Sequence, residues 1–332
     1  MLNNNEITKE TIETFDTIAN EWFDEMKSMW KTSSLVKYMN ILKLYLLPEF
    51  SGKMVSEITR NDVIEYVNTL LSTGGTNKNG LSSGTVATII YVLKNIFKYA
   101  VKVKGCSLNE RDGENIDDYF DIVFRHEKKR LRIMSTTEQK KLQNTLFENL
   151  TDCNLGILLC MYTGLRIGEI CALKWKDVID DDQCIYIHHT MQRIQTFDSN
   201  DRKTKVIITA PKSNSSIRRI PLPDEVYVLL DKYRKSEDAY ILTGLEEKYM
   251  EPRTMQNHFN SIANKCNIKN VTFHTLRHTF AARCIEIGFD TKSLSEILGH
   301  ASVNITLNRY VHPSMELKKK NMNMLSGMFN DK

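Results

Sequence analysis

Apolar residues recur at helical spacing through the first hundred positions of this 332-residue chain and then lose that spacing. Phe15, Ile18, Ala19 and Trp22 occupy positions i, i+3, i+4 and i+7, which form one face of an α-helix. Similar stripes predict further helices over 33–47 (stopping at Pro48), 61–71 (capped by Thr59 and Asp62) and from Ser82 or Ser83 to about 101. Four helices with short connections predict a compact helical bundle.

The pattern divides the chain into a short tail, 1–13, two domains and a linker. The helical domain covers 14–103, and the linker covers 104–134, where the periodicity disappears and polar and basic runs follow each other. The second domain, 135–332, begins with a helix capped by Ser135 and is mostly helical. Its β-rich segments are 184–189, 205–210 and 217–222. We therefore predict a mainly α fold with a small β-sheet.

Composition excludes several classes of protein. Hydrophobic residues make up 41% and charged residues 26%, which is ordinary for a globular protein. No stretch approaches the roughly 20 apolar residues of a membrane-spanning helix, and the first ten residues lack the apolar core of a signal peptide. The seven cysteines are odd in number and include no Cys-x-x-Cys pair. We therefore expect reduced core thiols, no membrane association and a cytoplasmic location.

Net charge is only +4, so overall charge does not identify a polyanionic partner. Basic residues are concentrated instead in two segments, as binding to a phosphate backbone requires. The residues that we predict to contact DNA are Arg125, Lys128, Lys129, Arg130, Arg132, Arg218 and Arg219. The alternative for each segment, taken alone, is a solvated linker or a solvated hairpin.

Several residues suit phosphodiester cleavage without a metal, which needs a nucleophile, donors for the phosphate oxygens and an acid for the leaving alkoxide. Tyr310 is a candidate nucleophile. Arg166 and Arg277 are candidate donors, because a guanidinium stays charged and presents paired N–H groups. Lys212, between two β-rich segments, is a candidate acid at a hairpin tip. Taken singly, a half-buried tyrosine, surface arginines and an exposed lysine are the simpler interpretations.

Three histidines and a glutamate accompany these residues. His274 and His278 stand four positions apart, as in a zinc-binding helix, but the metalloprotease glutamate after the first histidine is absent. His274 and His300 titrate near neutrality and are candidate phosphate donors or proton carriers. We expect supporting roles for His278, as a buried hydrogen-bonded histidine, and for Glu169, which can orient the Arg166 guanidinium or reach toward His300. The alternative for Glu169 is an acid that favours a helix dipole.

The ordered set Arg166, Lys212, His274, Arg277, His300 and Tyr310 resembles the complete catalytic signature of the tyrosine recombinases, the phage integrase family. Its motifs are Thr-Gly-Leu-Arg-x-Gly-Glu at 163–169, His-x-Leu-Arg-His at 274–278, and Leu-Gly-His at 298–300 followed by the tyrosine. The resemblance covers about 14–328 and implies a helical, SAM-like core-binding domain and a mixed α/β catalytic domain. The spacing of ten residues from His300 to Tyr310 is most similar to the spacing in integrases of phages and conjugative transposons.

The resemblance implies that Tyr310 attacks one strand to form a 3′-phosphotyrosine and frees a 5′-hydroxyl. The two arginines, His274 and His300 would hold the phosphate, and Lys212 would protonate the leaving oxygen. No ATP, metal or other cofactor is implied. Attack by the freed hydroxyl on a second duplex would then pass through a Holliday junction.

The implied partner is double-stranded DNA carrying recombination sites, bound by a homotetramer on two duplexes. An amphipathic helix predicted at about 314–329 resembles the family's tail that docks on a neighbouring protomer, with self-docking as the alternative. An excisionase or a host DNA-bending protein is a further expected partner. The expected location is the bacterial cytoplasm, at the nucleoid when acting.

The leading interpretation is a recombinase that integrates or excises a mobile element. A Xer-like resolvase or a DNA invertase is the nearest alternative. A type IB topoisomerase-like enzyme and a non-catalytic DNA-binding protein are more distant alternatives. A protein that had lost its activity would have no reason to retain the nucleophile, the two arginines and the acid together.

Overall fold

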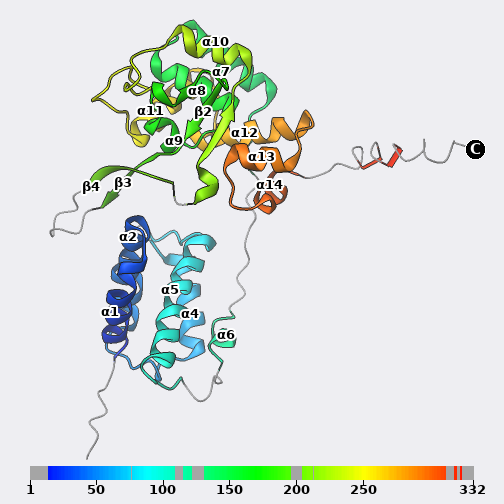
Figure 1. Cartoon of the computed structure of the whole chain (residues 1–332). Coiled ribbons are helices and arrows are strands. Elements are labelled where there is room, and N and C mark those ends of the chain that lie inside the picture. The colour runs from blue at the N-terminus through cyan, green and yellow to red at the C-terminus, as the bar shows by residue number, and fades with distance from the viewer. Residues whose placement is uncertain are drawn as a thin grey trace, which may run out of the picture. The chain divides into compact units, whose positions relative to one another are not determined.

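The computed structural model describes residues 14–75, 77–108, 115–121, 131–195, 204–211, 213–311, 318–319 and 322–323. The chain divides into two compact units, residues 1–129 and 130–332 (Figure 1). Within the described residues, the first unit is helical and the second combines helices with two small antiparallel sheets, so the predicted fold class is confirmed. None of the described helices is both long and apolar enough to cross a membrane.

The first unit is built from helices whose apolar faces meet in one core. Its elements are α1 (Phe15–Met26), η1 (Lys27–Met29), α2 (Thr32–Ile41), η2 (Leu42–Leu46), α3 (Leu47–Phe50), α4 (Arg60–Thr73), α5 (Ser83–Lys102) and α6 (Ile116–Tyr119). Thr59 and Asp62 form the predicted capping box of α4, and Ser82 is the N-cap of α5. The stripe on α5 is buried along its length, from Val86 to Ala100. The helical periodicity therefore identified the core of this unit correctly.

The predicted end of the second helix at Pro48 is wrong. The helical path continues through Pro48 to Phe50, because a π-helical turn, η2, precedes the proline. The amide of Leu47 bonds to the carbonyl of Leu42, five residues back. Pro48 then stands in the first turn of α3, where a missing N–H costs little.

Part of the segment after α5 is buried, whereas we predicted a linker between the domains. Ile116, Tyr119 and Phe120 are buried in the core of the first unit, and the Tyr119 hydroxyl donates to the carbonyl of Ile58. Part of the expected 104–134 linker is therefore packed on the helical unit. Four predicted DNA contacts, Arg125, Lys128, Lys129 and Arg130, lie outside the described residues.

The second unit has one large apolar core around the buried helix α8 and a smaller cluster at its C-terminal end. Its helices are α7 (Thr136–Glu148), α8 (Asp152–Thr163), α9 (Ile167–Ala172), η4 (Trp175–Asp177), η5 (Asn214–Ser216), α10 (Asp224–Lys232), α11 (Pro252–Lys265), α12 (Phe273–Glu286), α13 (Thr291–Leu298) and α14 (Val303–Tyr310). The last three helices pack on one another and are drawn in orange in Figure 1.

Among the described residues, five strands form two sheets. They are β1 (Val178–Ile179), β2 (Cys184–Ile187), β3 (Thr190–Gln195), β4 (Thr204–Thr209) and β5 (Arg218–Pro221). One sheet has the order β1-β2-β5, and β3 pairs with β4 in the other. The predicted hairpin tip at Lys212 is therefore wrong: β4 is paired with β3, whereas β5 returns to β2. Lys212 belongs to the connection between the sheets and lies outside the described residues.

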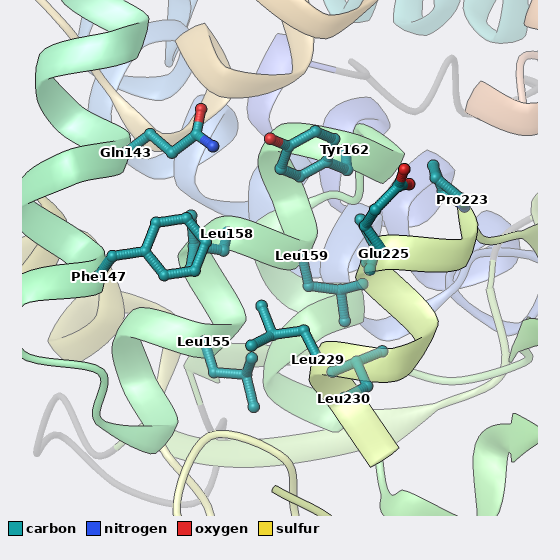
Figure 2. Close-up of a pocket in the computed structure, with 11 residues that line it drawn as sticks. Gln143, Phe147, Leu155, Leu158, Leu159, Tyr162, Pro223, Glu225, Leu229 and Leu230 are labelled. Atoms are coloured by element: carbon teal, nitrogen blue, oxygen red, sulfur yellow. The ribbon is translucent and has the colours of Figure 1, made fainter. Parts of the chain in front are cut away.

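A groove of about 310 Å³ lies among α7, α8 and α10 (Figure 2). Its walls are mainly apolar, with Phe147 from α7, Tyr162 from α8 and Leu229 from α10 among the lining residues. None of the predicted site residues lines it. The candidate chemistry therefore lies elsewhere in this unit.

Candidate active site

Arg166 occupies the N-cap of α9, directly after a tight turn at the end of α8. Gly164 forms this turn with a φ of 64°, and its amide bonds to the carbonyl of Cys160. A Cβ at Gly164 would stand 2.6 Å from the Phe280 ring, so the left-handed conformation and the close approach both favour glycine. The Thr-Gly-Leu-Arg motif thus links the buried helix to an arginine that is only partly covered.

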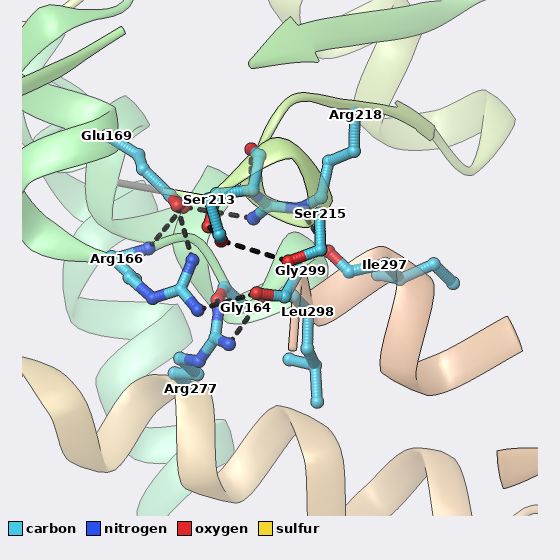
Figure 3. A network of polar contacts seen from close by, with 11 residues as sticks. Gly164, Arg166, Glu169, Ser213, Ser215, Arg218, Arg277, Ile297, Leu298 and Gly299 are labelled. Atoms are coloured by element: carbon cyan, nitrogen blue, oxygen red, sulfur yellow. Dashed lines mark hydrogen bonds and ion pairs between the residues drawn. The ribbon is translucent and has the colours of Figure 1, made fainter. Parts of the chain in front are cut away.

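The C-terminal end of α13 receives three arginines, which we call the three-arginine cap (Figure 3). Helices end in carbonyls that lack intrahelical partners and carry partial negative charge. Three successive carbonyls each accept a hydrogen bond from a different arginine. The pairs are Arg218 Nε with Ile297 O at 2.5 Å, Arg277 Nη2 with Leu298 O at 2.5 Å, and Arg166 Nη2 with Gly299 O at 2.9 Å.

Arg277 is the most buried member of the cap, with 2% of its surface exposed. Its other terminal nitrogen donates to the carbonyl of Gly164 at 2.8 Å, so it joins the end of α8 to the end of α13. Desolvation, and then the charge of Arg166, lowers the pKa of Arg277 to about 9. The guanidinium therefore still carries its positive charge at neutral pH.

Glu169 lies between two of these arginines and is 2% exposed. Its carboxylate accepts from Arg166 Nη1 at 2.7 Å, as expected, and from both terminal nitrogens of Arg218 at 3.1 and 3.0 Å. Burial raises the pKa of Glu169, but Arg218 and then Arg166 outweigh this effect and hold it at about 2. The carboxylate is thus ionised and orients both guanidinium groups.

Arg218 is not the exposed DNA contact that we predicted. Its side chain is 6% exposed and fully engaged with Glu169, Ile297 and the carbonyl of Ser216. Alternation along β5 explains the burial, because Arg218 and Ile220 point inward while Arg219 points outward. This period-two pattern in the sequence was the signal that could have revealed Arg218 as an internal residue.

We expect Arg218→Met to lower the free energy of unfolding by about 3 kcal/mol, because it leaves a buried carboxylate with one ion-pair partner fewer. Chemical denaturation monitored by circular dichroism measures the change. Arg219→Met is the matched control, since its side chain is 62% exposed, forms an ion pair with the exposed Asp182 and lies over the Tyr186 ring at the surface. That variant should lose less than about 1 kcal/mol. Equal losses in the two variants would contradict the structural role of Arg218.

Tyr310 is the last residue of α14, and its ring is held in the small apolar cluster of the second unit. Leu294 and Leu298 of α13 and Cys284 of α12 belong to the same cluster. The tyrosine is 7% exposed, and burial raises the pKa of its hydroxyl, although Arg277 and Arg309 oppose this shift. The ring is therefore fixed in position while the hydroxyl lies within the field of the arginines.

Two histidines contact Tyr310 in different ways. His278 Nδ1 lies 2.7 Å from the tyrosine hydroxyl, within hydrogen-bonding distance. The His300 ring instead stacks parallel to the tyrosine ring, with centroids 6.5 Å apart, and its Nδ1 bonds to Thr306 Oγ1 at 2.8 Å. The hydroxyl thus has one histidine nitrogen directed at it and one histidine face beside its ring.

Burial and the arginines keep the histidines neutral at pH 7. Desolvation, followed by the charges of Arg277 and Arg166, lowers the pKa of His300 to about 3. Desolvation and His274 lower the pKa of His278 to about 4. The pKa of His274 is also lowered, by partial desolvation and then Arg277, although its side chain remains open to solvent.

The remaining predicted contacts differ in environment. Arg132 bonds to Glu138 and to the carbonyl of Ile133. Arg219 is exposed and lines a groove of about 860 Å³ between β5 and α13–α14, together with His300 and Lys292. The groove carries exposed basic side chains, Arg219 and Lys292 among them, beside His300.

The chain matches known protein families along most of its length. Residues 125–316 match the phage integrase family, and residues 14–71 match the N-terminal SAM-like domain of phage integrases. The predicted SAM-like and catalytic folds are confirmed by these matches.

Two curated relatives illustrate the similarity. The chain is 26% identical to a tyrosine recombinase XerC-like protein of Caldanaerobacter subterraneus, over 95% of this chain and 83% of that protein. It is 25% identical to the ICEBs1 integrase of Bacillus subtilis, over 82% of this chain and 72% of the relative.

Solved structures share the fold. The Tn1549 transposon integrase in complex with transposon right end DNA has a TM-score of 0.73 at 20% identity, covering 95% of this chain and 100% of that one. A lambda integrase tetramer bound to a Holliday junction has a TM-score of 0.63 at 18% identity, with coverages of 89% and 80%. At these identities the likeness concerns the fold.

Proposed function

Because this chain belongs to the phage integrase family and is a site-specific DNA recombinase, we propose that Tyr310 is its nucleophile. We also propose that the enzyme serves a mobile element. One observation carries the proposal: a buried tyrosine hydroxyl lies beside a neutral histidine within the field of the three-arginine cap. Burial keeps the Tyr310 hydroxyl protonated, while the nearby arginines favour an anionic phosphate beside it and partly offset the rise in its pKa. The family match spans residues 125–316, which include Tyr310 and the three arginines, and the geometry supports the roles proposed for them.

The proposed chemistry balances without a metal or ATP. The Tyr310 hydroxyl gives its proton to a neighbouring base as its oxygen attacks phosphorus, and the bond to the 5′-oxygen breaks, leaving a 3′-phosphotyrosine. Arg166 and Arg277 neutralise the non-bridging oxygens, with His274 and His300 as further donors. Lys212 gives its proton to the departing 5′-oxygen. Arg166 is the more accessible of the two arginines, since its side chain is 32% exposed.

The proposed task is integration or excision through a Holliday junction. The freed 5′-hydroxyl of one duplex attacks the phosphotyrosine of another, and a second round completes the exchange. Support comes from relatives that mobile elements encode, such as the ICEBs1 integrase and the Tn1549 integrase in complex with its circular intermediate DNA. A Xer-like resolvase or a DNA invertase would use the same site.

The proposed assembly is a homotetramer on two DNA duplexes. The lambda integrase structures, as a dimer on a core site and a tetramer on a junction, support it by analogy of fold. Docking of the tail at 314–329 on a neighbouring protomer is part of the proposal, and most of that tail lies outside the described residues. An excisionase or a DNA-bending protein would add directionality. The proposed place of action is the bacterial nucleoid.

The test uses duplexes built from the DNA that flanks this chain's own gene, nicked near each candidate cleavage site so that the adduct is trapped. We expect a detergent-resistant adduct and, with two duplexes, a four-way junction in the absence of ATP and metal. Tight binding without an adduct would contradict the proposal and favour a non-catalytic DNA-binding protein. Plasmid relaxation without any junction would favour a topoisomerase-like enzyme.

A further inference from the structure

We propose that His278 is a catalytic residue that accepts the phenolic proton of Tyr310 through Nδ1. This inference rests on the proposed function, because it assumes that Tyr310 is the nucleophile. It goes beyond the supporting role expected from the sequence. It also assigns the proton to a different histidine from the two that were candidates for proton transfer, His274 and His300.

The position of the His278 ring carries the proposal. Its Nδ1 lies 2.7 Å from the Tyr310 hydroxyl, inside the range that general base catalysis requires. The ring comes from α12 and the hydroxyl from α14, so helix packing sets the distance. Both rings are at least partly buried, and their centroids are 5.8 Å apart. The base and the nucleophile are therefore already paired before DNA binds.

The neighbouring histidines are less suited to this role. The His300 ring is parallel to the tyrosine ring to within 5°, and its Nδ1 is committed to Thr306. His274 stands one helical turn before His278, and the two rings meet edge to face at 5.4 Å. The side chain of His274 is exposed, which suits contact with a phosphate. Among the described residues, His278 is thus the histidine directed at the nucleophile.

The surroundings of His278 keep its imidazole neutral before DNA binds, so one ring nitrogen carries no proton. On its own helix it faces His274 and Arg277, and from α14 it faces Arg309 and Tyr310. Desolvation, then His274 and the two arginines, disfavour a positive charge on the ring and lower its pKa to about 4. A neutral imidazole must hold one nitrogen unprotonated, and the bond to the hydroxyl favours Nδ1 for that role.

The neighbouring charges also affect the proton transfer during attack by Tyr310. As the bond from the Tyr310 oxygen to phosphorus forms, the phenolic proton passes to Nδ1 and His278 becomes an imidazolium. The phosphate then offsets this charge, since it brings negative oxygens to Arg166 and Arg277. In the reverse step the imidazolium returns the proton to the departing tyrosine. One proton moves in each direction, and no further reactant is required.

The test compares single-turnover cleavage of a nicked duplex by the full-length wild-type protein and by His278→Ala from pH 6.5 to 8.5. Without a base, attack depends on the ionised phenol, whose fraction rises tenfold per pH unit. Neutral His278 in the wild type does not change over this range. The ratio of the wild-type cleavage rate to the variant rate should be about 100 to 1,000 at pH 7. It should fall about tenfold for each unit by which the pH rises. Other titrating groups cancel in the ratio.

Two further variants separate a base from a structural support. His278→Gln can still hydrogen-bond the hydroxyl but cannot take its proton, so we expect the same pH-dependent loss. Added imidazole should restore cleavage to His278→Ala and not to His278→Gln. His258→Ala is the matched control, because that histidine is also partly buried and hydrogen-bonded, to Asn154, away from the site. Its rate ratio should be independent of pH.

A rate ratio for His278→Ala that is the same at every pH, with no rescue by imidazole, would overturn the proposal. A glutamine variant with the wild-type rate would overturn it too. Neither result would affect the proposed function, which depends on adduct formation by the wild-type protein and its loss without the Tyr310 hydroxyl.

Discussion

Replacing Tyr310 by phenylalanine is expected to abolish covalent attachment to DNA while leaving the fold and the DNA affinity intact. The substitution removes only the hydroxyl, and the ring keeps its apolar neighbours on α12 and α13. The loss leaves His278 Nδ1 without its partner, at a cost of about 1 kcal/mol. Cleavage should fall by at least about 10⁴-fold, since phenylalanine has no nucleophilic oxygen.

The measurement is adduct formation on the nicked duplex, with a gel shift of the same duplex as the binding control. Tyr162→Phe is a suitable control variant, because that tyrosine is 38% exposed and lines the separate apolar groove. It should form the adduct at the wild-type rate. An adduct that survives in Tyr310→Phe would rule out this tyrosine as the nucleophile.

Arg166→Ala is expected to reduce cleavage by about 10³-fold and to change DNA affinity by less than about tenfold. A preorganised donor to a reacting phosphate contributes about 3 to 4 kcal/mol to the transition state. Most affinity, in contrast, comes from many dispersed phosphate contacts. Arg166 is a better choice than Arg277 for this test, because Arg277 is buried and joins two helix ends.

Single-turnover cleavage rates and gel shifts at one salt concentration measure the two effects. Arg219→Ala is the control, since that arginine is exposed in the groove beside His300 and touches none of the three carbonyls at the end of α13. It should weaken binding slightly and leave the cleavage rate at saturation unchanged. Equal losses of binding and cleavage in Arg166→Ala would contradict its assignment to the reacting phosphate.

Local sequence rules predicted the elements on which the site is built. The predicted capping pair at Thr59 and the predicted N-cap at Ser135 are both present, because each depends on residues within one helical turn. The expected contact between Glu169 and Arg166 is present for the same reason. Interactions between residues three or four positions apart can be read from sequence alone.

Interactions between distant segments were less predictable. The pairing of β4 with β3, and of β5 with β2, depends on which strands meet in space, so the connection holding Lys212 was misjudged. The bond between Arg218 and Glu169 spans 49 positions, and the bond between His278 and Tyr310 spans 32. Only the tertiary placement of β5 near α9, and of α12 near α14, decides that these side chains meet.

The three-arginine cap has a consequence for how this site can change over generations. Arg166 and Arg218 share one carboxylate, and all three arginines share the end of one helix. Substitutions at such positions are not additive, because each removes contacts that the others need. A lineage that altered one arginine would lose fitness before a second change could compensate. We therefore expect the three arginines, Glu169 and the end of α13 to be retained together or lost together.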